Sequence, residues 1–152
     1  MYQGNPIHED RPQPAGWLKL VLGMVLVITL IMGIILISQD KVGALVMFAV
    51  TLFDAVLFYC IIPRSYQIYT DRLKIVLGGP FGMTILFKDI RSVTRVGGSN
   101  AFGSTGIRFA TSNKYVVKII RKGKMSVVIS PSGGELFLEQ LNQALKNYAG
   151  YR

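Results

Sequence analysis

Two long apolar runs near the N-terminus dominate the hydropathy pattern of the chain. They cover residues 17–37 and 44–62 and are 21 and 19 residues long. Polar side chains interrupt them at five positions: Lys19, Thr29, Thr51, Asp54 and Tyr59. At about 1.5 Å of rise per residue, each run as a helix roughly matches a hydrocarbon core of about 30 Å. Only a helix satisfies its own backbone polar groups across such a core, so the pattern predicts two transmembrane helices joined by a tight hairpin.

The alternative is a pair of buried helices in a soluble protein. A core helix rarely stays apolar on all its faces for so long, which favours the membrane interpretation. Residues 1–16 hold three prolines and three charged side chains, a composition that predicts a disordered tail. The expected organisation is therefore a tail over residues 1–16, a transmembrane hairpin over 17–62 and a cytoplasmic domain over 63–152.

Charge is distributed unevenly along the chain. The formal net charge is +9, and the segment from Pro63 onward holds 14 Lys and Arg against 4 Asp and Glu. Because basic residues accumulate on the cytoplasmic side of membrane helices, this excess predicts a cell-membrane protein with both termini in the cytoplasm. Charge of this kind beside a bilayer faces anionic lipid head groups more often than nucleic acid, and the sequence holds no nucleic-acid motif.

After Pro63 the hydrophobic period changes from helical to alternating. Alternation and turn residues predict seven short strands, at residues 65–70, 73–77, 83–88, 89–96, 107–111, 115–120 and 125–130. Ser132 and Glu135 then fit the S-x-x-E capping box that starts a helix. Apolar side chains follow along one face of that helix: Phe137, Leu138, Leu141, Leu145 and Tyr148. A short, partly open seven-stranded barrel with one helix across an open end accounts for this order.

Three segments of this domain resemble bacterial pleckstrin-homology-like domains: YQIYTDRL from Tyr66, FKDIRSV from Phe87 and VISP from Val128. The resemblance implies a membrane-anchored α+β fold, in which two transmembrane helices precede a pleckstrin-homology-like barrel capped by a C-terminal helix. Such a pair of membrane helices recurs in that family. Phosphoinositide-binding members of the wider fold use a basic first hairpin. The corresponding hairpin here, Thr70-Asp71-Arg72, contains an acid, and this departure argues against a specific phosphoinositide pocket.

Four basic residues form the first candidate contact surface. Arg121, Lys122 and Lys124 lie on one predicted hairpin tip, and Lys114 lies on a neighbouring turn. Near an anionic leaflet each cation contributes about 1 kcal/mol of attraction, so anionic head groups or a partner protein are candidate ligands. A solvated edge that discourages strand-to-strand aggregation explains the same charges equally well.

The loop at residues 97–106 is the second candidate contact surface. It contains four glycines, and its length suits a contact segment in which Asn100 and Phe102 meet a partner. Residues 98–105 spell G-x-x-x-x-G-S-T. A phosphate-binding loop needs Lys in place of Ser104 and a helix directly after it, so we reject that interpretation.

Asp54 is the most unusual residue of the apolar runs. It lies near the middle of the second run, where insertion scales give a carboxylate a cost of about 2.5–3.5 kcal/mol. The functional interpretations are a contact to a polar group on another subunit, or an ion or proton site. The structural alternative is a protonated acid bonded to a neighbouring hydroxyl, for which Thr29 lies at a similar depth in the first run.

The sequence offers little material for catalysis. Cys60 is the only cysteine and lies in an apolar run, and His8 is the only histidine and lies in the tail. The four carboxylates after Pro63 suggest no acid–base pair, so we predict no catalytic, cofactor or metal site. We expect a non-catalytic, membrane-anchored binding or assembly module, whose partner is a membrane protein, a second copy of the chain or anionic head groups. The alternative is a small accessory subunit of a transport or channel complex that uses Asp54.

Overall fold

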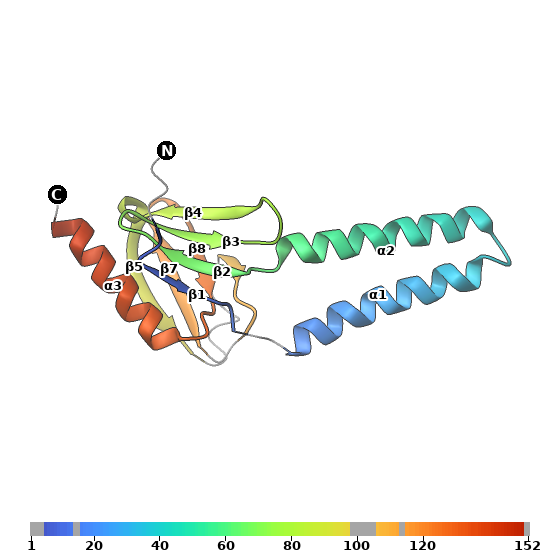
Figure 1. Cartoon of the computed structure of the whole chain (residues 1–152), viewed down its shortest axis with the longest axis horizontal. Coiled ribbons are helices and arrows are strands. Elements are labelled where there is room, and N and C mark those ends of the chain that lie inside the picture. Colours follow the sequence, from blue (N-terminus) through green and yellow to red (C-terminus); the bar gives the residue numbers. More distant parts are fainter. Residues whose placement is uncertain (1–4, 14–15, 98–105, 113–114, 151–152) are drawn as a thin grey trace. The chain divides into compact units, whose positions relative to one another are not determined.

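The computed structural model describes residues 5–13, 16–97, 106–112 and 115–150 and divides the chain into two compact units (Figure 1). One unit is Ala15–Ile61, and the other joins Met1–Pro14 to Ile62–Arg152. The larger unit, called the domain below, is therefore discontinuous in sequence. The helical hairpin is an insertion within this domain and not an N-terminal extension of it.

The hairpin unit consists of α1 (Gly16–Leu36) and α2 (Lys41–Ile61), each 21 residues long. Both helices are long and apolar enough to cross a membrane. Only 6% of an apolar 18-residue stretch of each helix is buried. A core helix of a soluble protein is mostly buried, so this exposure disfavours the alternative of two buried helices.

The buried residue of each described helix of the hairpin is small, Gly33 in α1 and Ala44 in α2. Gly33 of α1 is buried, and a Cβ atom at this position would lie 3.2 Å from a ring carbon of Phe48 in α2. Small side chains of this kind let membrane helices approach closely. Asp40 precedes α2 and accepts a 3.0 Å hydrogen bond from the Val42 N–H, which satisfies one of the free donors of the first turn.

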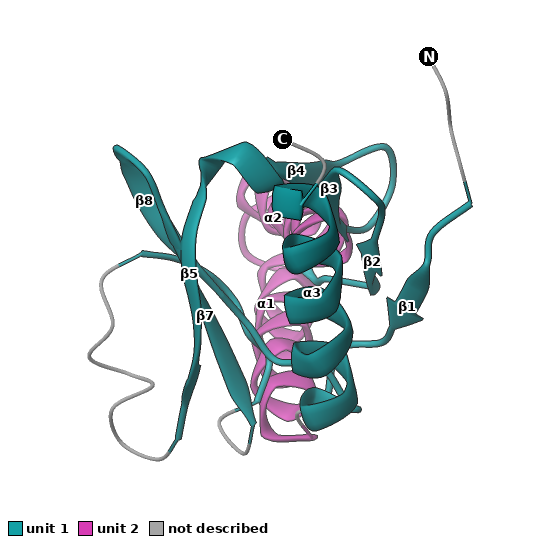
Figure 2. Ribbon diagram, turned by 90° about the vertical axis from the view of Figure 1, so that its left-hand side faces the viewer, with its two compact units in different colours: residues 1–14, 62–152 teal, residues 15–61 magenta. Residues whose placement is uncertain are grey.

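Eight strands in the described part of the domain form two four-stranded sheets (Figure 2). The first sheet has the order β1-β2-β3-β4, with the strands β1 (His8–Asp10), β2 (Ser65–Ile68), β3 (Arg72–Val76) and β4 (Gly82–Leu86). The second has the order β5-β7-β8-β6, with the strands β5 (Ile90–Val96), β6 (Ile107–Phe109), β7 (Val116–Arg121) and β8 (Lys124–Ile129). A short 3-10 helix, η1 (Phe87–Asp89), connects the two sheets.

Each of the seven predicted strands overlaps one of these strands, and β1 is an additional one. The two sheets are separate, not closed into the expected barrel. The second sheet is not a simple meander, because β6 pairs in parallel with β8, along the edge that β7 does not occupy. Ser130 explains this position, because its Oγ accepts hydrogen bonds from the N–H groups of Thr111 at 2.9 Å and Ser112 at 3.3 Å.

The core lies between the two sheets and α3 (Gly134–Gly150), which contacts strands of both (Figure 2). Phe137 and Leu141 of α3 are fully buried, and the Phe137 ring meets the Tyr66 ring at 6.1 Å between centroids. Leu138, Leu145 and Tyr148 are half-buried against the same core, which confirms the predicted apolar face. Burial raises the pKa of Tyr66 to about 12, and its hydroxyl donates a 2.8 Å bond to the Phe109 carbonyl.

The N-terminal segment differs most from the sequence-based expectation. Residues 8–10 were predicted to belong to a disordered tail, but they pair antiparallel with β2, with Asp10 opposite Tyr66. The chain then continues along the end of β8, where the Gln13 N–H bonds the Ser130 carbonyl at 2.8 Å. These bonds attach the residues before α1 to the residues after α2.

Asp10 also changes how α3 begins. Its carboxylate accepts bonds from the Ser132 hydroxyl at 2.6 Å and from the Gly133 N–H at 2.8 Å. The predicted capping box between Ser132 and Glu135 is therefore wrong. The Ser132 hydroxyl is engaged by Asp10, and Glu135 faces Arg95 at 3.4 Å instead.

Replacing Asp10 with alanine tests this capping role. We expect the free energy of unfolding of the domain to fall by about 1 kcal/mol, the usual cost of deleting a helix-capping side chain. Urea titration of the whole chain in detergent micelles, followed by circular dichroism, measures the change. Glu9→Ala removes the exposed neighbouring carboxylate of β1 and should cost less than about 0.5 kcal/mol. Equal losses in the two variants would contradict the capping role.

Candidate functional site

A hollow of about 580 Å³ lies on the surface of the domain, where η1, the start of β5, the β7–β8 turn and the last turns of α3 converge. Four basic side chains line it: Lys88, Arg91, Lys122 and Lys146. Asn142 and Ser92 add polar groups. We call this feature the basic hollow.

Each cation of the basic hollow is held by a different element. Lys88 belongs to η1, Arg91 follows at the irregular start of β5, and Lys146 lies on the exposed side of α3. Lys122 lies in a two-residue turn whose second residue, Gly123, has a φ of +62°, a conformation that favours glycine. Lys88 and Lys146 are therefore far apart in the sequence but line the same hollow.

Aromatic packing builds the apolar part of the basic hollow. The rings of Phe87 and Tyr148 meet edge to face, with centroids 5.8 Å apart and an interplanar angle of 81°. Phe87 is buried in the core, and this contact joins η1 to the last turns of α3. The backbone elements that carry Lys88 and Lys146 are thus held together by a core contact.

Three of the six carboxylates in the described part of the domain form ion pairs with other cations. Asp71 faces Arg72 at 3.4 Å, Asp89 bonds Lys124 at 2.8 Å and Glu135 faces Arg95 at 3.4 Å. The four cations of the basic hollow are exposed and form no ion pair with any residue that the structure describes. Their positive charge is therefore available to a ligand.

Asp89 fixes the turn that carries Lys122. Its backbone carbonyl accepts a 2.8 Å bond from the Lys122 N–H, and its carboxylate accepts the bond from the Lys124 ammonium group. The hydrogen bond from Lys124 holds the pKa of Asp89 below its ordinary value, and the charges of Lys124, Lys88 and Arg121 act in the same direction. The Asp89 carboxylate therefore stays ionised at neutral pH and keeps its ion pair with Lys124.

The residues of the predicted basic surface lie in different surroundings. Lys122 lines the basic hollow, whereas Lys124 is paired with Asp89, and Arg121 donates a 2.6 Å bond from Nε to the Met125 carbonyl. The other predicted contact residues, Lys114, Asn100 and Phe102, lie outside the described residues.

Sequence reasoning missed Lys88, Arg91 and Lys146. The pair Lys88 and Arg91 was visible as a K-x-x-R spacing beside a strand junction. Nothing in the local sequence shows that Lys146, far later in the chain, lies opposite them. Among the residues that the structure describes, no group of three His, Cys, Asp or Glu side chains could hold a metal ion. The chemistry of the hollow suits recognition of an anion.

The hairpin gives a different result for Asp54. Thr29 does not contact it, since the Thr29 hydroxyl donates to backbone carbonyls of its own helix and accepts a 3.0 Å bond from the Thr51 hydroxyl. Within the described residues no hydrogen bond reaches the half-exposed Asp54 carboxylate. The predicted Thr29–Asp54 pair is therefore replaced by a Thr29–Thr51 pair.

Comparison with known proteins gives one result. The family described as "Bacterial PH domain" matches residues 64–145, which is more than half of the chain and includes every residue of the basic hollow up to Leu145. No curated protein and no solved structure matches the chain.

Replacing Lys124 with methionine tests the electrostatic part of this site. Without the ammonium group, the pKa of Asp89 should rise toward the ordinary aspartate value of about 3.9. Because the pair lowers this pKa, its contribution to stability is present above the unfolded value and disappears as the pH falls through the folded one. A pH titration of the Asp89 carboxyl carbon by NMR measures the shift. Lys74→Met, on β3, should leave that titration unchanged, and an unchanged curve in Lys124→Met would contradict the pairing.

Proposed function

Because the chain belongs to the bacterial PH domain family, we propose that it is a non-catalytic binding module anchored in the cell membrane by α1 and α2. The basic hollow is the observation that carries this proposal. Four exposed cations converge there from separate elements, and none forms an ion pair with a described residue. An anionic ligand is the complement of such a surface.

The discontinuous domain supports a two-span topology. Residues before α1 and residues after α2 fold into one unit, so both must lie on the same side of any membrane that the hairpin enters. Two helices that each cross once meet this requirement. The basic excess after Pro63 supports the proposal that this side is the cytoplasm.

The basic hollow lies at the end of the domain remote from both connections to the hairpin. Val76 at the end of β3 pairs with Ser65 at the start of β2 and with Gly82 at the start of β4, so these three strand ends lie together. The hollow begins after the other end of β4. The helix α3 likewise starts beside Asp10 and brings its last turns to the hollow. At about 1.5 Å per residue, α3 separates the two ends by roughly 20 Å.

The connections between the domain and the hairpin are short. Only a few residues separate the last bonded residue of the N-terminal segment, Gln13, from the start of α1 at Gly16, and three separate Ile61 from Ser65. At no more than about 3.6 Å per residue, neither connection reaches across the domain. These lengths favour a hollow that is not held against the bilayer, and we therefore propose an acidic segment of a partner protein, instead of lipid head groups, as its ligand.

The first hairpin of the domain agrees with this assignment. Arg72 is engaged by the Asp71 carboxylate and lies 5.3 Å from the centre of the Tyr69 ring. The cation that a phosphoinositide site would need at this hairpin is thus already paired.

Charge reversal in the basic hollow tests the proposal. The chain is placed in nanodiscs of neutral lipid, and binding of a fluorescent polyglutamate peptide is followed by anisotropy at low salt. The double variant Arg91→Glu with Lys122→Glu should weaken binding by about tenfold or more, since two attractive pairs become repulsive. Two reversals outside the hollow, Lys74→Glu with Lys118→Glu, change the net charge equally and should leave the affinity within about twofold.

Two outcomes would contradict the proposal. Equal weakening by the two double variants would mean that net charge, and not the basic hollow, attracts the peptide. Loss of peptide binding when anionic lipid is added to the nanodiscs would mean that the hollow faces the bilayer.

Asp54 favours a second candidate function, an accessory role in a membrane complex. Its carboxylate has no hydrogen-bond partner among the described residues and lies in the apolar stretch of α2. A polar group at such a depth commonly meets a polar group on another helix.

Replacing Asp54 with leucine tests this second candidate. If Asp54 joins subunits, native mass measurement in detergent should show loss of the higher-mass species, while peptide binding at the basic hollow persists. Thr51→Val, which removes the inner hydroxyl pair of the hairpin, is the control and should keep the assembly. An unchanged mass distribution in Asp54→Leu would remove the basis for an assembly contact.

A further inference from the structure

The turn between β3 and β4 carries an unusual surface residue. Phe81 is 57% exposed, although it is one of the largest apolar side chains of the domain. The turn is closed by a 3.1 Å bond from the Leu77 N–H to the Phe81 carbonyl, and Gly79 within it has a φ of +68°. This geometry holds the aromatic residue in a fixed turn.

The composition of the turn is also unusual. The segment from Leu77 to Gly82 reads Leu-Gly-Gly-Pro-Phe-Gly and contains no charged, hydroxyl or amide side chain. Turns exposed to water are normally rich in such groups. A turn without them loses little when it is taken out of bulk water, because it has no polar side chain to desolvate.

The register places this turn at the end of the domain where α2 joins. The Arg64 N–H donates a 2.8 Å bond to the carbonyl of Val76, the last residue of β3. The chain before Arg64 therefore runs beside the chain after Val76, which is the Phe81 turn. Only two residues separate Arg64 from Ile61, the last residue of α2.

We propose that the β3–β4 turn dips into the head-group region of the bilayer, with Phe81 as the residue that enters it. The inference rests on the proposed membrane anchoring and adds a third point of contact to the two helices. An apolar aromatic side chain on a rigid, uncharged turn suits the boundary between head groups and acyl chains. The turn thereby fixes the orientation of the domain, with the basic hollow held outward.

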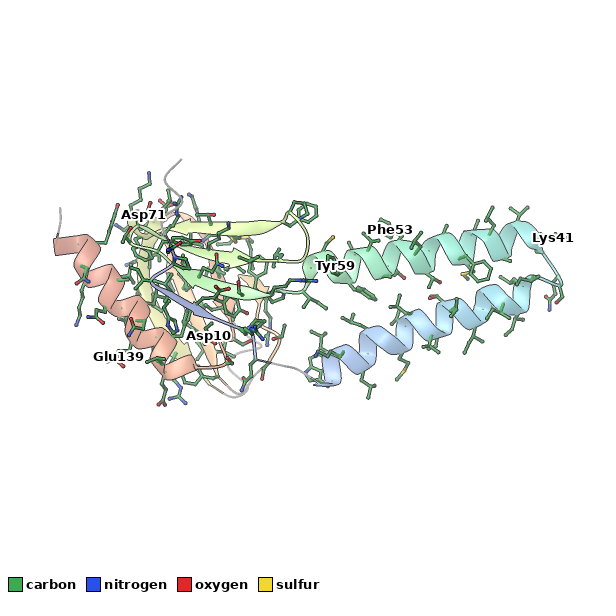
Figure 3. The ribbon with its side chains drawn as sticks, viewed as in Figure 1. Asp10, Lys41, Phe53, Tyr59, Asp71 and Glu139 are labelled. Carbon is green, nitrogen blue, oxygen red and sulfur yellow. The ribbon has the colours of Figure 1, made fainter. Side chains whose placement is uncertain are left out.

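Tryptophan scanning in lipid tests the inference. Trp17 is the only tryptophan, so Trp17→Phe gives a silent background. Into this background we introduce one tryptophan at a time, as Phe81→Trp, Phe53→Trp or Met125→Trp. Phe53 projects from α2 (Figure 3), and Met125 lies at the start of β8, at the same end of the domain as the basic hollow. The three positions are similarly exposed, at 57%, 65% and 68%.

The full-length variants are reconstituted in vesicles of neutral lipid with or without bromine on the acyl chains, at one depth near the head groups and at another near the methyl ends. We expect brominated lipid to quench the fluorescence of Phe81→Trp and Phe53→Trp by about half and to leave Met125→Trp unchanged. Quenching in Phe53→Trp while Phe81→Trp behaves like Met125→Trp would overturn the inference and leave the anchoring intact. Absence of quenching in Phe53→Trp would overturn the anchoring, and the inference with it.

Discussion

The pairing of β1 with β2 attaches the residues before α1 to those after α2, and the Asp10 carboxylate extends that attachment to the start of α3. Each bond is modest, since a capping side chain contributes about 1 kcal/mol. Their arrangement matters more than their sum. Because of this arrangement, the hairpin is an insertion within the domain and not an extension at its N-terminus. The chain segments that lead into α1 and out of α2 both leave the domain at one end of the two sheets.

That constraint separates two surfaces of the domain. The end near the connections carries an uncharged turn and Phe81, whereas the opposite end carries the basic hollow. Local ion pairs sharpen the contrast. The Asp89 carboxylate forms an ion pair with Lys124, whereas the Asp89 backbone carbonyl accepts a hydrogen bond from the Lys122 N–H. One acidic residue therefore positions a cation without neutralising it.

The sequence predicts those parts of the fold that depend on local patterns. Alternating residues such as Leu73 and Ile75 are fully buried, and the 3.6-residue spacing places Phe137 and Leu141 in the core, as expected. The β1 strand escaped prediction because His-Glu-Asp is short and polar, and its central residue pairs with a β2 residue 58 positions later. Asp10 likewise displaced the local Ser132–Glu135 box. The basic hollow depends on tertiary packing between η1 and α3, which no local spacing reveals.

The discontinuous domain has a consequence for how the protein is made. The His8–Asp10 segment leaves the ribosome first, yet its helix-capping partner Gly133 lies 123 residues later. At about 5–20 residues per second, roughly 6–25 seconds pass before the two can meet. Both apolar helices, α1 and α2, are synthesised during that interval. If the hairpin inserts as proposed, its insertion would therefore begin before the domain could complete its fold.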